Sequence, residues 1–208
     1  MMKKVSISVA SILLVSLVAG CSNPATDGAG ANSGQTGAAP AASASAPAVS
    51  EAEKNYQDAL RLIASNGQGQ VMTDAASLLL KASADGHAGA KFELAKLYQA
   101  GKGVEQNTGE ATNLLRASAD AGNADAAYKL ATMYAVGDGI EKNEGEALNL
   151  YLKAGQAGSA DAALKVGEIY QNGSGIPADL GEAKAWYQKA ADKGNAEAAE
   201  KLKALGAK

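Results

Sequence analysis

Residues 122–157 read GNADAAYKLATMYAVGDGIEKNEGEALNLYLKAGQA, and closely related stretches recur along the chain. They begin at Gly86 and Gly158, and a shortened one begins at Gly194, so that each start lies 36 residues after the previous one. A constant period between about 20 and 50 residues is typical of arrays in which each unit packs against its neighbours. The sequence therefore predicts a stack of similar 36-residue units.

Each unit contains the start and stop signals of two helices. Asn123 precedes the first helical pattern, and its side-chain oxygen can accept a hydrogen bond from a free N–H of the first turn. Gly137 ends this helix near Val136, because the residue after a helix often needs a positive φ. Asn143 and Glu146 have the spacing of a capping box, which predicts reciprocal hydrogen bonds at the start of the second helix.

Apolar residues recur in columns at spacings of three and four, which places them on shared helix faces. Small residues at Ala95, Ala131 and Gly167 predict a close approach of two helices. A helix pair of this length cannot bury its own apolar face, so the pairs must stack. The predicted core columns of the central unit contain Leu130, Met133, Tyr134, Ala147, Leu150 and Tyr151.

These columns resemble the Sel1-like repeat, a relative of the tetratricopeptide repeat. The resemblance covers about residues 50–208, and it implies an all-α fold, a right-handed α-α solenoid of helix-turn-helix repeats. Two departures are the absence of the cysteine pair that many members carry in each repeat, and glutamate at Glu146 and its equivalents where lysine is usual. The family pattern is matched by Ala162, Val166, Gly167, Tyr170, Gly173, Gly175, Ile176, Asp179, Ala183, Trp186, Tyr187, Lys189, Ala190, Ala191 and Gly194.

The N-terminus has the features of an export signal. A basic start is followed by an apolar run at residues 5–19, which is shorter than the roughly 20 residues of a transmembrane helix. The run ends in Val18-Ala19-Gly20-Cys21, which resembles the bacterial lipobox and implies cleavage before Cys21 and acylation of Cys21. An ordinary signal peptide with an incidental cysteine is the alternative. Ser22 is not the aspartate that retains lipoproteins in the inner membrane, so we expect an outer-membrane anchor and a domain in the periplasm.

The predicted organisation begins with that signal and ends with a capping helix. Residues after Cys21 are almost entirely Ala, Ser, Gly, Pro, Thr and Asn, a composition that cannot offset the entropy of ordering and predicts a disordered tether. The first repeat is degenerate, as expected of a terminal unit that faces water on one side. The predicted segments are a signal peptide at 1–20, Cys21 and the tether at 21–50, repeats at 51–85, 86–121, 122–157 and 158–193, and a C-terminal capping helix at 194–208.

The sequence contains no recognisable catalytic constellation, so we predict that the protein is not an enzyme and needs no cofactor or metal. His87, the only histidine, occupies the N-cap position of Asn123 and is interpreted as a surface cap. The Gly101-Lys102-Gly103 loop follows no strand, which excludes a phosphate-binding loop. The recurring acids are explained by caps and first turns. A net charge of −3 argues against a nucleic-acid partner.

One surface could bind a partner, namely the side of each first helix that avoids the core columns. In related solenoids this side lines a concave surface. The alternative is a solvated face with Asp125–Lys129 and Asp161–Lys165 as i,i+4 ion pairs. The polar, mixed-charge pattern favours a protein or peptide over an apolar ligand. The candidate protein-binding residues are Glu93, Lys96, Lys129, Thr132, Lys165, Glu168 and Asn172.

We therefore expect a lipid-anchored, monomeric scaffold or regulator of an envelope assembly, which binds another envelope protein or peptide through this concave face. Similar Sel1-like lipoproteins serve exopolysaccharide or cell-wall machinery. One alternative is a module that binds peptidoglycan or another glycan without catalysis. A further alternative is a hydrolase acting on β-lactams or peptidoglycan, although the cysteine pairs of that subgroup and an evident nucleophile are absent from the sequence.

Overall fold

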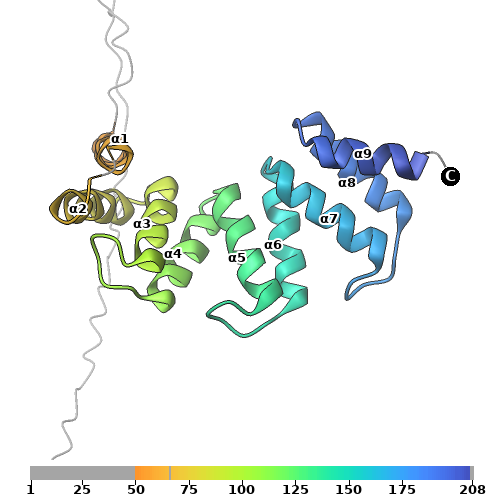
Figure 1. Ribbon diagram of the computed structural model, residues 1–208, viewed down its shortest axis with the longest axis horizontal. Helices are drawn as coiled ribbons and strands as arrows, with labels where there is room; N and C mark the ends of the chain where they lie inside the picture. Colours follow the sequence, from red (N-terminus) through yellow and green to blue (C-terminus); the bar gives the residue numbers. More distant parts are fainter. Residues whose placement is uncertain (1–49, 66, 207–208) are drawn as a thin grey trace, which may run out of the picture. The chain divides into compact units, whose positions relative to one another are not determined.

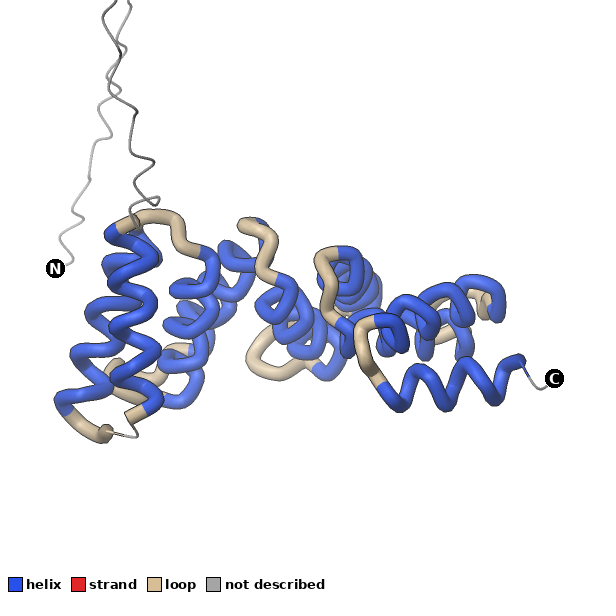
Figure 2. The backbone as a smooth tube through the Cα atoms, turned by 90° about the horizontal axis from the view of Figure 1, so that it is seen from above, coloured by secondary structure: helices blue, strands red, loops and turns tan. Residues whose placement is uncertain are grey.

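The computed structural model describes residues 50–65 and 67–206, all of which belong to one compact unit, Ser45–Lys208. Within these residues the chain forms α-helices joined by loops, with no strand (Figures 1 and 2). The predicted signal peptide at 1–20, the lipidation site Cys21 and the tether up to residue 49 lie outside the described residues. The helices are α1 (Glu51–Ala64), α2 (Gln70–Ala84), α3 (Ala88–Ala100), α4 (Thr108–Asp120), α5 (Ala124–Val136), α6 (Glu144–Gln156), α7 (Ala160–Asn172), α8 (Leu180–Asp192) and α9 (Ala196–Gly206).

The helices form a stack in which each one packs mainly on the helix before it and the helix after it. Packing is most extensive within the pairs α1–α2, α3–α4, α5–α6 and α7–α8, and less extensive between pairs. The final helix α9 packs on α8 (Figure 1). The predicted all-α solenoid of helix pairs is therefore confirmed, and it places the first helices α3, α5 and α7 in equivalent positions of successive repeats.

The first helices begin and end at the predicted signals. Asn123 and Ser159 accept hydrogen bonds from the backbone N–H groups of Ala126 and Ala162, at 2.9 and 3.3 Å. Gly137 has a φ of 80° and its N–H donates to the carbonyl of Met133 at 2.8 Å. Any residue with a Cβ would be strained in this left-handed conformation, which explains why glycine stops each first helix.

The second helices are capped differently from the predicted box. Asn143 accepts from the N–H of Glu146 at 3.0 Å, as expected. The reciprocal half of the prediction is wrong, because the backbone N–H of Asn143 donates to the carbonyl of Tyr134 at 2.9 Å. The loop folds back onto α5, so a carbonyl of its last turn satisfies this donor and Glu146 stays exposed. Asn107 and Asp179 make the same bond to Tyr98 and Tyr170, at 3.0 and 2.8 Å.

Buried residues form three clusters along the stack, and they confirm most predicted core columns. Tyr187 has no exposed surface, and an added Cβ on Gly167 would lie 2.6 Å from its ring, so this glycine permits the predicted close approach of α7 and α8. The predicted burial of Tyr134 is only partial, because this residue is half-buried and its hydroxyl accepts a hydrogen bond from Arg116 at 2.6 Å. A tyrosine in this column places its polar end at the surface, where water and Arg116 can reach it.

Candidate binding surface on the first helices

The predicted binding residues lie on α3, α5 and α7, at equivalent positions of three successive repeats. We call this surface the first-helix face, and define it by Glu93 and Lys96 on α3, Lys129 and Thr132 on α5, and Lys165, Glu168 and Asn172 on α7. Lys96, Thr132 and Asn172 are exposed and the other four are half-buried. A half-buried side chain can contact both neighbouring residues and solvent. The three helices differ in the ion pairs and hydrogen bonds that these side chains form.

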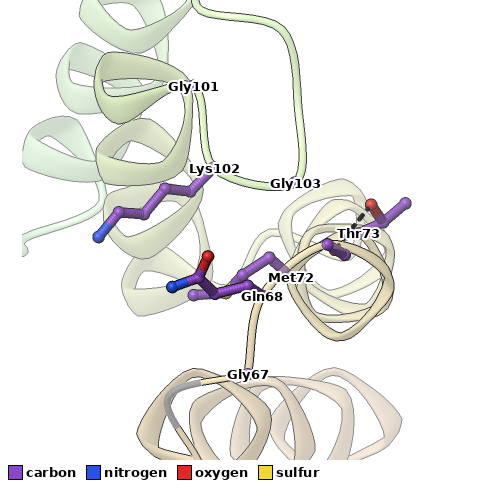
Figure 3. Close-up of a pocket in the computed structure, with 8 residues that line it drawn as sticks. Gly67, Gln68, Met72, Thr73, Gly101, Lys102 and Gly103 are labelled. Carbon is purple, nitrogen blue, oxygen red and sulfur yellow. Dashed lines mark hydrogen bonds between the residues drawn. The ribbon is translucent and has the colours of Figure 1, made fainter.

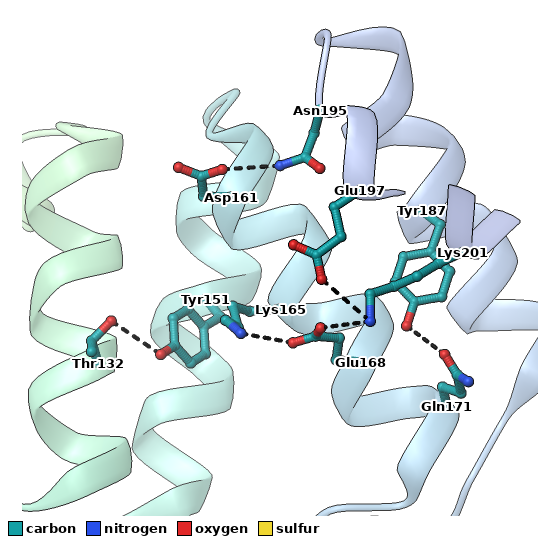
Figure 4. A network of polar contacts seen from close by, with 10 residues as sticks. All are labelled: Thr132, Tyr151, Asp161, Lys165, Glu168, Gln171, Tyr187, Asn195, Glu197 and Lys201. Atoms are coloured by element: carbon teal, nitrogen blue, oxygen red, sulfur yellow. Dashed lines mark hydrogen bonds and ion pairs between the residues drawn. The ribbon is translucent and has the colours of Figure 1, made fainter. Parts of the chain in front are cut away.

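On α3 and α7 the acid and the base of the face neutralise each other. Lys96 Nζ lies 2.8 Å from Glu93 Oε2, and Lys165 Nζ lies 2.8 Å from Glu168 Oε2. The predicted i,i+4 pair of Lys165 with Asp161 is wrong, because Asp161 instead accepts from the amide of Asn195 on the loop before α9 at 3.0 Å (Figure 4). The pairs therefore span three residues rather than four, and the lysines of α3 and α7 are already engaged.

Glu168 also links α7 to the last helix. Its other carboxylate oxygen lies 3.0 Å from Lys201 Nζ on α9, and Lys201 lies 3.4 Å from Glu197 (Figure 4). Burial raises the pKa of Glu168, but hydrogen bonds from Lys165 and Lys201 outweigh it and hold this pKa below its usual value of 4.5. The charged side chains of the first-helix face on α7 are therefore already paired in an ion network with the capping helix α9.

The central helix α5 lacks the acid–base pair of its neighbours. Thr132 stands where α3 has Lys96 and α7 has Glu168, and its hydroxyl donates to the carbonyl of Tyr128 at 3.0 Å. The hydroxyl of Tyr151 lies 3.1 Å from it (Figure 4). Among the described residues, neither Lys129 nor Asp125 forms an ion pair, so the predicted i,i+4 pair on α5 is also wrong.

A hollow of about 350 Å³ lies on α5, at the point where the face lacks its acid–base pair. Val136 borders it with 67% of its surface exposed. Two of the lining residues, Lys129 and Thr132, are predicted binding residues. The aromatic and thioether floor is not predicted, because the period places those residues in the core columns. The hollow is lined by Phe92, Asp125, Tyr128, Lys129, Thr132, Met133, Val136 and Asp138.

Aromatic packing fixes the floor of this hollow. The rings of Tyr128 on α5 and Tyr151 on α6 lie with centroids 5.6 Å apart at a tilted angle, a favourable arrangement for two aromatic side chains. Burial raises the pKa of the Tyr128 hydroxyl. On α3, the ammonium of Lys96 lies 5.3 Å from the centroid of Phe92. The floor is thus apolar and held by neighbouring helices, while charged side chains surround it.

A larger hollow of about 640 Å³ lies between the loops of the first two repeats (Figure 3). It includes the Gly101-Lys102-Gly103 loop, where Gly101 and Gly103 have φ values of 62° and 70°. An added Cβ on Gly103 would overlap the carbonyl of Met72, so the loop lies directly on the first turn of α2. The glycines therefore serve helix termination and close packing, and none of the predicted binding residues lines this hollow.

His87 caps α3, as predicted, but it also joins two repeats. Its Nδ1 accepts from the N–H of Ala90 at 3.0 Å, so Nε2 carries the proton and donates to Glu53 on α1 at 2.8 Å. The ring of Tyr56 packs against it at a centroid distance of 4.3 Å. Within residues 50–65 and 67–206, no group of three or more His, Cys, Asp or Glu side chains is arranged to hold a metal ion. None of the helices in the described part combines the length and the apolar character needed to cross a membrane.

Comparison with known proteins agrees with this geometry. The Sel1 repeat model matches residues 88–123, 124–159 and 160–195, which is just over half of the chain. The chain therefore belongs to the Sel1 repeat family. Proteins of this family are generally non-enzymatic scaffolds that bind other proteins. The matched spans have the predicted length of 36 residues and begin where α3, α5 and α7 begin.

Two solved bacterial structures illustrate the similarity of the fold. A Sel1 repeat protein from Oxalobacter formigenes is 38% identical with a TM-score of 0.58, and the match covers 60% of this chain and 94% of that protein. A protective antigen of uropathogenic Escherichia coli strains, which displays an SLR fold, is 26% identical with a TM-score of 0.66. That match covers 73% of this chain but only 32% of the antigen. No curated protein matches significantly.

Proposed function

We propose that this protein is a scaffold or regulator of an envelope assembly, which holds a protein partner on its first-helix face. The observation that carries the proposal is the hollow on α5. There an apolar floor, an exposed Val136 and a lysine without an ionic partner among the described residues lie together. An exposed apolar surface with a charged border is typical of sites that bind proteins. We expect the partner to bind without rearrangement of this surface, because α5 packs against the helices on both sides of it.

The membrane anchor is the second part of the proposal. A lipid attached to Cys21 would keep the repeat domain in the periplasm beside the outer membrane, at the end of the tether. Several acyl chains, at about 0.8 kcal/mol for each buried CH₂, form a stable anchor. Mass spectrometry of the mature N-terminus tests this part directly. Acylated Cys21 supports it, and a mature chain without fatty acid, released from membranes at low salt, contradicts it.

In-cell crosslinking tests the binding face. A photoreactive amino acid at position 129 should capture a specific protein, and the same amino acid at exposed Lys184 on α8, away from the first-helix face, serves as the control. In a separate pull-down from membranes with the repeat domain as bait, charge reversal by Lys129→Glu with Lys165→Glu should change the amount of partner captured. Unchanged capture would show that the partner binds elsewhere. Sedimentation with purified peptidoglycan separates this role from that of a glycan-binding module, which would sediment without any captured protein.

A further inference from the structure

The three complete repeats differ at one place on the first-helix face. Positions 100, 136 and 172 are equivalent, and they carry Ala100, Val136 and Asn172. Of these, only the central repeat combines a large apolar side chain with exposure, since Val136 is 67% exposed. The repeat architecture does not require an exposed valine there, because alanine and asparagine serve the same structural position. The exposed valine is therefore particular to the central repeat of this chain and is not needed for the packing of its repeats.

One of the charges around the hollow, Asp138, is also particular to the central repeat. Asp125 and Asp138 are exposed, and neither takes part in an ion pair among the described residues. The equivalents of Asp138 are Lys102 and Ser174, so the acid does not recur. Lys129 is the only cation among the lining residues. Two carboxylates against one ammonium give the border a net negative charge, which favours a cationic ligand.

The size of the hollow limits what can occupy it. Its volume of about 350 Å³ is at the lower end of the range for ligand pockets. Its floor of Phe92, Tyr128 and Met133 suits an aliphatic or aromatic side chain that anchors a longer segment. A polypeptide can place such an anchor in the hollow while a neighbouring basic side chain reaches Asp125 or Asp138. The apolar floor and the acidic border together require both features in one ligand.

We propose that this hollow binds a short segment of a partner protein in which lysine or arginine lies next to a large apolar side chain. This inference rests on the proposed protein-binding function and specifies the chemistry of its partner. The apolar side chain of the segment covers Val136 and the aromatic floor. Its basic group pairs with Asp125 or with Asp138, which lie near opposite ends of α5. Lys129 opposes this pairing, so it lowers the affinity for the segment and favours segments whose positive charge lies away from it.

Selection of peptides tests the proposal without knowledge of the partner. A library of random 12-residue peptides displayed on phage is selected against the full chain, and the enriched peptides are synthesised for affinity measurement. We expect peptides with a basic residue beside Leu, Ile, Met, Phe or Trp. Asp125→Asn with Asp138→Asn should weaken their binding by up to about fivefold, as expected for the loss of one exposed ion pair. Lys129→Gln should strengthen it, and high salt should reduce both effects.

Two matched variants separate the hollow from the rest of the face. Val136→Asn introduces the residue that the next repeat carries at the same position, and it should weaken peptide binding while the protein stays folded. Asp161→Asn makes the same change as Asp125→Asn one repeat later, and it should have no effect on binding. Asp161 lies outside the lining residues, and asparagine can still accept the hydrogen bond from Asn195.

Several results would overturn the proposal. They are the absence of enriched peptides, the enrichment of acidic peptides, binding that Val136→Asn does not affect, or peptidoglycan binding that this variant abolishes. The proposed function fails separately, if crosslinking from position 129 and from the rest of the face captures no protein. A partner captured by α7 alone would refute this inference and leave the scaffold role intact.

Discussion

Single residue differences between the repeats make the surface of one repeat different from that of its neighbours. Thr132 is the clearest case, because a residue that cannot form an ion pair replaces the acid or base of its neighbours. It leaves Lys129 without the partner that Glu93 gives Lys96 and Glu168 gives Lys165. The sequence identified these positions as a stripe, but it could not predict which of them pair, since the choice depends on side-chain geometry across helices.

Glu168 gives a prediction about pH. Its pKa is held below its usual value of 4.5 in the folded protein, so the folded state binds fewer protons than the unfolded state near that pH. Its contribution to stability is therefore complete above about pH 4.5 and is lost as the pH falls through the lower folded value. We expect Glu168→Gln to reduce the dependence of the unfolding free energy on pH between pH 5 and 3.

Urea denaturation at a series of pH values measures this effect. Glu146→Gln is the matched control, because Glu146 is exposed and forms no ion pair among the described residues. If the two variants have the same pH dependence as the unsubstituted chain, the network between α7 and α9 does not contribute to stability in solution.

At the scale of the helix, local signals in the sequence were sufficient to locate starts and ends. The caps Asn123 and Asn143 and the stop Gly137 act where the sequence predicts them, because each one serves backbone groups within four residues along the chain. The prediction failed for the amide of Asn143, whose acceptor is the carbonyl of Tyr134 on another helix. A partner nine residues away depends on the path of the loop, which spacing alone does not describe.

This correction leads to a prediction about the capping of α6. Asn143→Ala should lower the unfolding free energy by about 1 kcal/mol, since it removes the side-chain oxygen that accepts from the first turn. Glu146→Ala should cost less, because its side chain makes no hydrogen bond to the cap. Thermal or urea denaturation measures both. Equal losses for the two variants would restore the reciprocal capping box and contradict the bond from Asn143 to Tyr134.

At the scale of the whole domain, the sequence period was sufficient to predict the stack, since predicted core columns such as Leu94, Leu130 and Val166 are buried in successive units. It did not predict the hollow on α5. A period describes what the repeats share, and the hollow arises where Thr132, Val136 and Asp138 depart from their equivalents. The candidate stripe was therefore placed on the correct helices, while the part of it with space for a ligand required the three-dimensional arrangement.

The stack also predicts how damage spreads through the molecule. Extensive contacts join only consecutive helices among the described ones, so stability should be local to a repeat and its neighbours. Tyr187 belongs to the buried cluster of α7, α8 and α9, and its hydroxyl donates to Gln171 at 2.6 Å. Tyr187→Ala should cost about 3–5 kcal/mol, as expected for truncation of a buried aromatic residue.

Hydrogen exchange followed by mass spectrometry identifies the helices that this substitution destabilises. In Tyr187→Ala, amide exchange should accelerate in α7, α8 and α9, less in α5 and α6, and not in α1 to α3. Tyr134→Ala is the control in the central repeat, where the smaller expected loss follows from a half-buried ring whose hydroxyl is bonded to Arg116. Uniform acceleration along the whole chain would mean that the repeats unfold as one cooperative unit, in which case the first-helix face could not keep its shape while the capping end opens.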